Sequence, residues 1–178
     1  STGIRCRSPD PSGGGGMSLI TNYWPDPRFI HAGKLSLNGC VIASHNSVFN
    51  PAASSFPGIS LKATRDGDNW ASLKLNLNAG MTLIASCLSN GAATFASSPL
   101  NIWSDSQLLA QCPSNGGASG EFVVPASGSF LFCLRAPKQS GSIINIMNVF
   151  VGTKADYTAL AKLVPSGFLA GDLMPQQN

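Results

Sequence analysis

Charged side chains are scarce in this chain of 178 residues, which has eleven Lys or Arg, eight Asp or Glu and a formal net charge of +3. They make up 11% of the sequence, whereas a typical soluble domain has about 25%. The net charge is too small, and the apolar fraction of 43% too large, for a disordered chain. The missing charge is therefore replaced either by neutral polar side chains or by surface that is hidden against partners.

Several other signals are absent as well. No apolar run approaches the roughly 18 residues of a membrane span, so we expect no membrane partner. The five cysteines show no zinc-binding spacing, and their odd number favours free thiols in a reducing compartment over two disulfides plus a spare cysteine. None of the 13 asparagines begins an N-x-S/T glycosylation sequon, and the first residues lack the apolar core of a signal peptide.

Residues that commonly carry catalysis are also few. His31 and His45 are the two histidines, and Glu121 is the single glutamate. A pair of catalytic carboxylates would therefore have to use aspartates such as Asp66, Asp68 or Asp105. No G-x-S-x-G sequence is present to position a nucleophilic serine. We therefore predict that the chain is not an enzyme and that it has no catalytic residues and no cofactor.

Two further motifs are incomplete. Asp66 and Asp68 lie in a DGDN sequence that resembles the start of a calcium loop, but the glycine at its sixth position and the acidic residue at its twelfth are missing. A turn explains both aspartates, so we predict no metal site. The run Gly13–Gly16 is not followed by the G-K-S/T of a phosphate-binding loop and is more typical of a flexible segment.

What the sequence does contain is a series of short apolar or alternating runs separated by Gly, Pro, Asn and Ser. The clearest alternation is Leu73-Lys-Leu-Asn-Leu77. The runs that we interpret as strands fall at 35–42, 59–63, 73–78, 81–88, 102–103, 108–110, 121–124, 129–134 and 143–151. About eight strands at this spacing, with one helical pattern at Lys154–Val164, predict an all-β antiparallel sandwich or barrel.

This pattern also suggests how the chain is divided. Residues 1–23 contain prolines and the glycine run and are predicted to form an irregular N-terminal arm. The β domain is predicted over 24–165. Residues 166–178 form a C-terminal tail without strand or helix periodicity.

In outline, the sequence resembles the capsid domains of picorna-like plant viruses, the comovirus, nepovirus and cheravirus group. The similarity lies in the aromatic Tyr23-Trp24-Pro25, in Gly-Lys-Leu-x-Leu at 33–37, and in the segments 129–135 and 143–154, which look like the last two strands of such domains. The tail at 167–175 is similar to the tails of these proteins. The length fits best a single small coat protein of the cheravirus type.

The resemblance implies an eight-stranded antiparallel jelly-roll β-sandwich that serves as a structural coat protein of a small icosahedral positive-strand RNA virus. Its partners would be other coat-protein subunits, and its location the virion and, during assembly, the host cytoplasm. Genomic RNA would be contacted weakly: about 60 copies at +3 supply roughly 180 positive charges, far fewer than the phosphates of a genome. Arg5 and Arg7, on the arm, are the candidate RNA-proximal residues.

The ends of the chain are the candidate assembly elements. A domain of this length has a radius of gyration of about 16 Å, while 23 extended residues span up to about 75 Å and 13 span about 43 Å. The tail has four large apolar residues and a single charge, Asp172. We therefore expect contacts with neighbouring subunits, or with the domain itself, from Trp24, Phe168, Leu169, Leu173 and Met174.

Two other functions remain open from the sequence. A secreted bacterial β-sandwich attached to an enzyme would bind carbohydrate, using the tryptophans Trp24, Trp70 and Trp103 and the aspartates of the DGDN turn. Tryptophans near strand starts are, however, more often core or interface residues than sugar-stacking platforms. A viral protruding domain that binds a receptor would have the same β-fold but would leave the two long ends less well explained.

Overall fold

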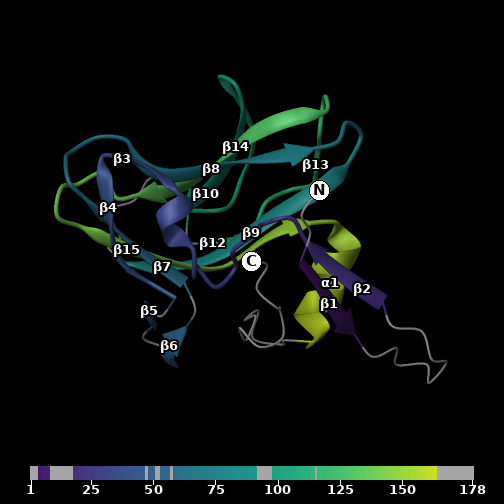
Figure 1. The fold of residues 1–178 in the computed structure, drawn as a ribbon, viewed down its shortest axis with the longest axis horizontal. Coiled ribbons are helices and arrows are strands. Elements are labelled where there is room, and N and C mark those ends of the chain that lie inside the picture. Colours follow the sequence, from purple (N-terminus) through teal and green to yellow (C-terminus); the bar gives the residue numbers. More distant parts are fainter. Residues whose placement is uncertain are drawn as a thin grey trace.

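The computed structural model describes residues 4–8, 18–46, 48–50, 53–56, 58–91, 98–114 and 116–163, and the side chains of most of them. Two antiparallel sheets form the body of the protein (Figure 1). One has five strands in the order β11 (Gln107–Gln111), β10 (Leu100–Ser104), β14 (Gly128–Ala136), β8 (Asn69–Leu77) and β3 (Ser36–Asn38). The other has six: β12 (Gly116–Ala118), β9 (Thr82–Gly91), β15 (Ile143–Gly152), β7 (Gly58–Ala63) and β4 (Cys40–His45), with β13 (Phe122–Val123) also pairing with β9.

The hydrophobic core lies between the two sheets. Alternation along the strands sends every second side chain inward, so that Phe130, Phe132 and Leu134 of β14 are all buried. The six-stranded sheet contributes residues such as Ile59 and Ile146 to the same cluster. The predicted all-β sandwich with little helix is therefore confirmed.

The described part of the chain contains fifteen strands, rather than the eight expected. Four of them form two separate hairpins: β1 (Ile4–Ser8) pairs with β2 (Ser18–Asn22), and β5 (Val48–Asn50) pairs with β6 (Ala53–Phe56). The prediction of an irregular arm over residues 1–23 is thus wrong for both of the first two strands. Such short strands are too brief to show a clear side-chain period in the sequence, and β2 is also fixed by the buried side chain of Ile20.

The β domain begins before Trp24, because Asn22 attaches the preceding segment to β15. The Asn22 side chain is fully buried. Its Nδ2 donates to the carbonyl of Val149 at 2.9 Å, and its Oδ1 accepts from the backbone N–H of Val151 at 2.9 Å. The Tyr23 N–H then donates to the Val151 carbonyl at 2.7 Å. A buried amide with its groups paired in this way fixes where the chain enters the domain.

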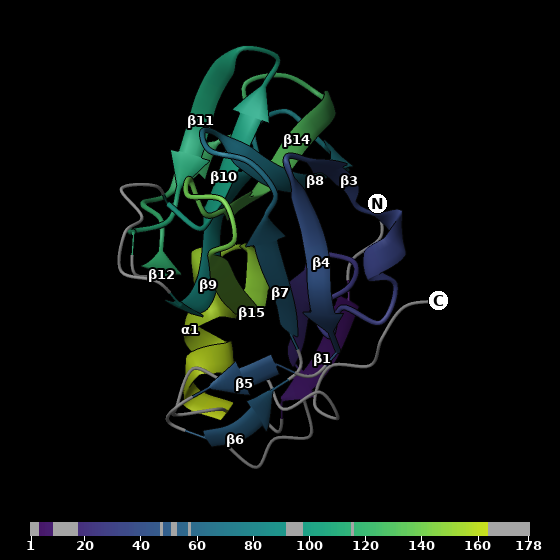
Figure 2. The ribbon, with the colours of Figure 1, turned by 90° about the vertical axis from the view of Figure 1, so that its left-hand side faces the viewer.

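The one α-helix among the described residues, α1 (Lys154–Leu163), follows β15 and ends within one residue of the predicted range. It packs against the outer face of the six-stranded sheet (Figure 2). There Leu160 forms a small second buried cluster with Ile20 and Phe150. The backbone N–H of Thr21 donates to Asp156 of the helix at 3.1 Å. A short 3₁₀ helix, η1 (Ala32–Lys34), precedes β3. Within the described residues, no helix is long and apolar enough to cross a membrane.

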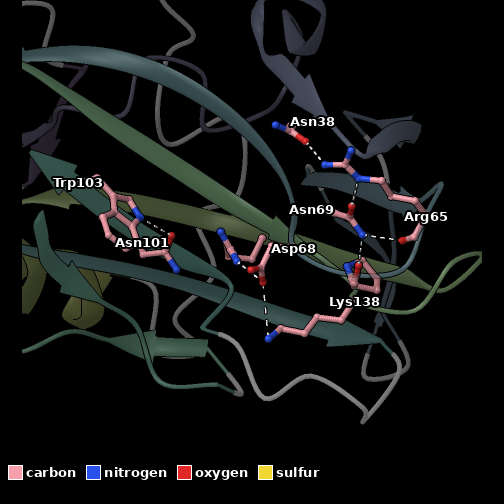
Figure 3. A network of polar contacts seen from close by, with 9 residues as sticks. Asn38, Arg65, Asp68, Asn69, Asn101, Trp103 and Lys138 are labelled. Carbon is pink, nitrogen blue, oxygen red and sulfur yellow. Dashed lines mark hydrogen bonds and ion pairs between the residues drawn. The ribbon is translucent and has the colours of Figure 1, made fainter. Parts of the chain in front are cut away.

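A buried asparagine ties together the corner where β8 begins (Figure 3). Asn69 is 0% exposed, and its Nδ2 donates to the carbonyls of Arg65 at 2.9 Å and Pro137 at 2.8 Å. Gly39 approaches this amide closely with φ of +66°, so that a Cβ there would overlap the Asn69 Oδ1. Glycine is therefore required at this position both for its backbone conformation and for space.

Candidate functional site

Two tryptophans that are not part of the hydrophobic core, Trp70 and Trp103, lie on the outer face of the five-stranded sheet. Residues directly opposite each other on antiparallel strands point to the same side of a sheet. Trp70 on β8 lies opposite Arg135 on β14, and Leu131 on β14 lies opposite Trp103 on β10. We call this the outer five-strand face and define it by these outward-pointing residues: Trp70, Ser72, Lys74, Asn76, Asn101, Trp103, Leu108, Leu131, Cys133 and Arg135.

At one end of this face, Trp70 packs against the guanidinium of Arg135, which is in turn paired with Asp68. The Arg135 guanidinium carbon lies 5.5 Å from the centroid of the Trp70 ring, within the range of a cation–π contact. Its Nη2 is 3.0 Å from Asp68 Oδ1, and Lys138 Nζ is 3.6 Å from the same oxygen (Figure 3). The Trp70 ring is therefore positioned by a neighbour with a fixed orientation, although the exposed ion pair itself contributes little stability.

At the other end, Trp103 is half-buried and its Nε1 donates to Asn101 Oδ1 at 3.1 Å (Figure 3). Leu131 and Leu108 lie directly opposite it on the two neighbouring strands, and Leu108 remains 39% exposed. The tryptophans at the two ends are separated by about 13 Å along β14 and by two strand spacings, about 10 Å, across the sheet.

The centre of the face is neutral. Cys133 lies between the two ends, and its thiol is 3% exposed. Burial raises the pKa of Cys133 to about 11, against a smaller lowering effect of the Arg135 charge. The thiol is therefore protonated at neutral pH, and the face combines apolar and aromatic surface with few charges, a composition suited to contact with protein or with sugar rings.

Trp24, which we expected at an assembly interface, lies instead in the core. Its side chain is 0% exposed and its ring centroid lies 5.9 Å from that of Phe29 and 6.4 Å from that of Phe132. Its Nε1 donates to the Asp26 carbonyl at 3.1 Å. The ring is thus enclosed by its own domain and presents no surface to a neighbouring subunit.

The other predicted interface residues are not placed by the structure. Phe168, Leu169, Leu173 and Met174 lie outside the described residues. Arg5 and Arg7 lie on β1, opposite Thr21 and Leu19, and only their backbone is described.

Several histidines and carboxylates among the described residues contact backbone groups or a cation of the same chain. Asp26 accepts the N–H groups of Ile30 and His31, both at 2.9 Å, and so stabilises the turn before η1. The ring of His45 lies 2.9 Å from the Phe29 carbonyl. Glu121 is paired with Lys154 at 3.8 Å. Across the described residues, no group of three or more His, Cys, Asp or Glu is placed to hold a metal ion.

The DGDN turn is explained by its contacts with protein groups. Asp66 Oδ1 accepts the backbone N–H of Ser140 at 2.8 Å, and Asp68 takes the two cations described above. These contacts connect the turn before β8 to the end of β14 and the loop that follows it. The interpretation of both aspartates as turn residues accounts for their positions.

Comparison with known proteins gives no matching family model and no matching curated protein. Among solved structures, the chain is similar to an arabinose-bound GH51 α-L-arabinofuranosidase, with a TM-score of 0.41 and 14% identity over 70% of this chain and 24% of that one. It is also similar to the C-terminal CBM6 of LamC, a marine laminarinase from Zobellia galactanivorans, with a TM-score of 0.38 and 15% identity over 68% of this chain and 95% of that one. The chain spans about a quarter of the arabinofuranosidase. TM-scores of this size do not assign it to either group.

Proposed function

We propose that this protein is a structural coat subunit of a small icosahedral positive-strand RNA virus, one of several jelly-roll subunits that form the shell around the genome. The observation that carries the proposal is the order in which the strands pair. It involves eight of the nine strands from β7 to β15, namely β7, β8, β9, β10, β11, β12, β14 and β15, and leaves out the two-residue strand β13, which lies between β12 and β14 in the chain.

These strands pair in a nested way. The first pairs with the last, the second with the seventh, the third with the sixth and the fourth with the fifth: β7 with β15, β8 with β14, β9 with β12 and β10 with β11. The additional pairs β9–β15 and β10–β14 join them into two four-stranded halves. A long antiparallel hairpin rolled into two sheets gives this order. It supports a jelly roll with β3 and β4 added at the sheet edges and with β13 paired to the start of β9.

Jelly rolls occur in viral capsids, lectins and cupins, so a further argument is needed to choose among them. The segments that resemble plant-virus coat domains fall on β14 and β15 and on the entrance to the domain around Trp24. The outer five-strand face adds two half-buried tryptophans and Leu108, and aromatic residues with Arg are enriched at protein interfaces. Both features favour a subunit whose function is contact with other subunits.

Assembly is the direct test. Sedimentation velocity and electron microscopy of the purified chain, alone and in native material, should reveal oligomers or shells much larger than the 18.4 kDa monomer. Trp103→Ala should reduce their formation while leaving the monomer folded by circular dichroism. Val123→Ala is the matched control, because Val123 is 59% exposed and lies on β13, away from that face. A chain that stays monomeric at millimolar concentration and is absent from particles would refute the proposal.

A carbohydrate-binding β-sandwich is the second candidate, and the position of Trp70 and Trp103 on one sheet face favours it. Exposed aromatic rings stack on the apolar faces of sugars. Affinity electrophoresis against a panel of soluble polysaccharides should then retard the wild-type chain but not Trp70→Ala or Trp103→Ala. Retardation without assembly would replace the coat proposal by this one.

A further inference from the structure

A small cavity lies beneath α1, on the outer face of the six-stranded sheet. Its volume is about 70 Å³. The side chains that line it are chiefly apolar and come from β9, β15 and α1: Leu88, Phe150, Tyr157, Leu160 and Ala161. Ala161 is exposed and Tyr157 is half-exposed, so the cavity opens along the C-terminal half of the helix.

A β-bulge in β15 shapes this cavity. Met147 lies opposite Leu88, but the next outward pair is Phe150 with Ser86, three residues further along β15 and only two along β9. The extra residue is taken up at Asn148, which has φ of +55° and itself lines the cavity. The bulge aims Phe150 at the helix, where its ring centroid lies 5.8 Å from that of Tyr157. The cavity is thus built into the strand and is not a gap between loops.

The helix above the cavity has little packing of its own. Leu160 is the helix residue in the buried cluster with Ile20 and Phe150, and Tyr157 and Ala159 are only partly covered. The chain leaves the helix at Leu163, within two turns of the cavity mouth. The sequence that follows, Val164-Pro-Ser-Gly167, contains a helix stop and a turn residue and leads into Phe168-Leu169.

We propose that the C-terminal tail of the same chain folds back over α1 and inserts the side chain of Leu169 into this cavity. The six residues from Leu163 to Leu169 span up to about 20 Å. The helix rises only about 9 Å from Tyr157 to Leu163, so this segment is long enough to bring Leu169 back from the end of the helix to the cavity. A cavity of about 150 Å³ accepts benzene; 70 Å³ suits a branched aliphatic side chain better than the ring of Phe168. The insertion does not depend on the proposed coat function.

Methyl NMR of the full-length chain tests this contact. With Leu and Val methyl groups labelled, and the Leu169 signals identified by their loss in Leu169→Ile, we expect nuclear Overhauser effects from the Leu169 methyls to the rings of Tyr157 and Phe150. Ser86→Leu places a larger side chain in the cavity and should move the Leu169 signals to random-coil positions. Thr158→Leu is the matched control, because Thr158 is exposed on α1 and does not line the cavity.

Accessibility gives a second readout that does not depend on assigned spectra. Chymotrypsin cleaves after large apolar residues, and we expect cleavage at Phe168 and Leu169 to be at least tenfold faster in Ser86→Leu than in wild type or Thr158→Leu. If Ser86→Leu does not fold, Ala161→Leu, which closes the mouth of the cavity, replaces it. Leu169 methyls at random-coil positions in the wild type, or contacts seen only between differently labelled copies, would overturn the proposal.

Discussion

The replacement of Trp24 by alanine tests whether this residue stabilises the core or forms an interface between subunits. We predict that Trp24→Ala lowers the free energy of unfolding of the isolated monomer by about 4 kcal/mol, within the ~3–5 kcal/mol typical of Trp or Phe truncations in a core. The indole is 0% exposed. Loss of about 200 Å² of buried surface at about 25 cal/mol/Å² gives an upper value of ~5 kcal/mol, and the Asp26 carbonyl also loses its donor.

Urea unfolding, followed by far-UV circular dichroism, measures this effect. With an m-value of about 2 kcal/mol/M, the midpoint should fall by about 2 M, and the melting temperature by roughly 8–16 °C. Trp24→Phe keeps most ring contacts but loses the Nε1 hydrogen bond, so we expect a loss of about 1–2 kcal/mol. Trp103→Ala, at a half-buried position, should also cost less. A Trp24→Ala monomer as stable as the wild type but unable to assemble would refute the core assignment and restore the interface role.

Three further predictions concern the β8 corner and the buried thiol. Asn69→Leu should destabilise the chain by about 2–4 kcal/mol in urea unfolding, because two buried carbonyls lose their N–H donor. Gly39→Ala should cost about 2–3 kcal/mol because its Cβ meets the Asn69 amide, whereas Gly67→Ala, also at positive φ but with no atom within 4 Å, should cost only about 1 kcal/mol; equal effects would contradict the steric argument. The pKa of Cys133 is raised to about 11 in the folded chain from 9.0, so its contribution to stability should be constant below pH 9 and be lost between pH 9 and 11. Cys133→Ser should therefore reduce the fall in stability over this range, to which Cys40 and Cys87 contribute as well, because burial raises the pKa of Cys40 and a thiol hydrogen bond together with burial raises the pKa of Cys87; an unchanged profile in that variant would contradict the prediction.

Strands with regular alternation could be read from the sequence, whereas short strands could not. The runs at 59–63, 73–78 and 129–134 fall on β7, β8 and β14, because a sandwich buries one face of each strand and the apolar residues follow that period. The first four residues of β8, 69–72, lie outside the predicted run. The strand β5 is only Val-Phe-Asn, β6 is Ala-Ser-Ser-Phe and β12 is Gly-Gly-Ala. Strands of three or four residues are too short to show a period, and β12 also depends on a partner, β9, that is distant in sequence.

In the candidate site too, some features could be predicted from the sequence and others could not. The period of β8 already turns Trp70 away from the side of Leu73 and Leu75, so its outward position follows from the sequence. That Trp103 shares the same face depends on the register of β10 and β8 against β14, which is set by tertiary packing. For Trp24 the sequence allowed core or interface, since a large aromatic residue serves both. The enclosure by Phe29 and Phe132 decides between them.

The scarcity of charged residues is reflected in the structure, where neutral amides make buried polar contacts. Asn22 and Asn69, both fully buried, satisfy buried backbone groups at two key joints of the fold with neutral amides, where an ion would carry a large desolvation penalty. On the outer five-strand face, the Arg135 charge is already paired with Asp68, which leaves Lys74 as the cation of that face that pairs with no carboxylate among the described residues. Phosphate binding gains its strength from several unpaired cations that displace counterions. A face with paired charge and two tryptophans is therefore better suited to another protein surface or to a sugar than to RNA.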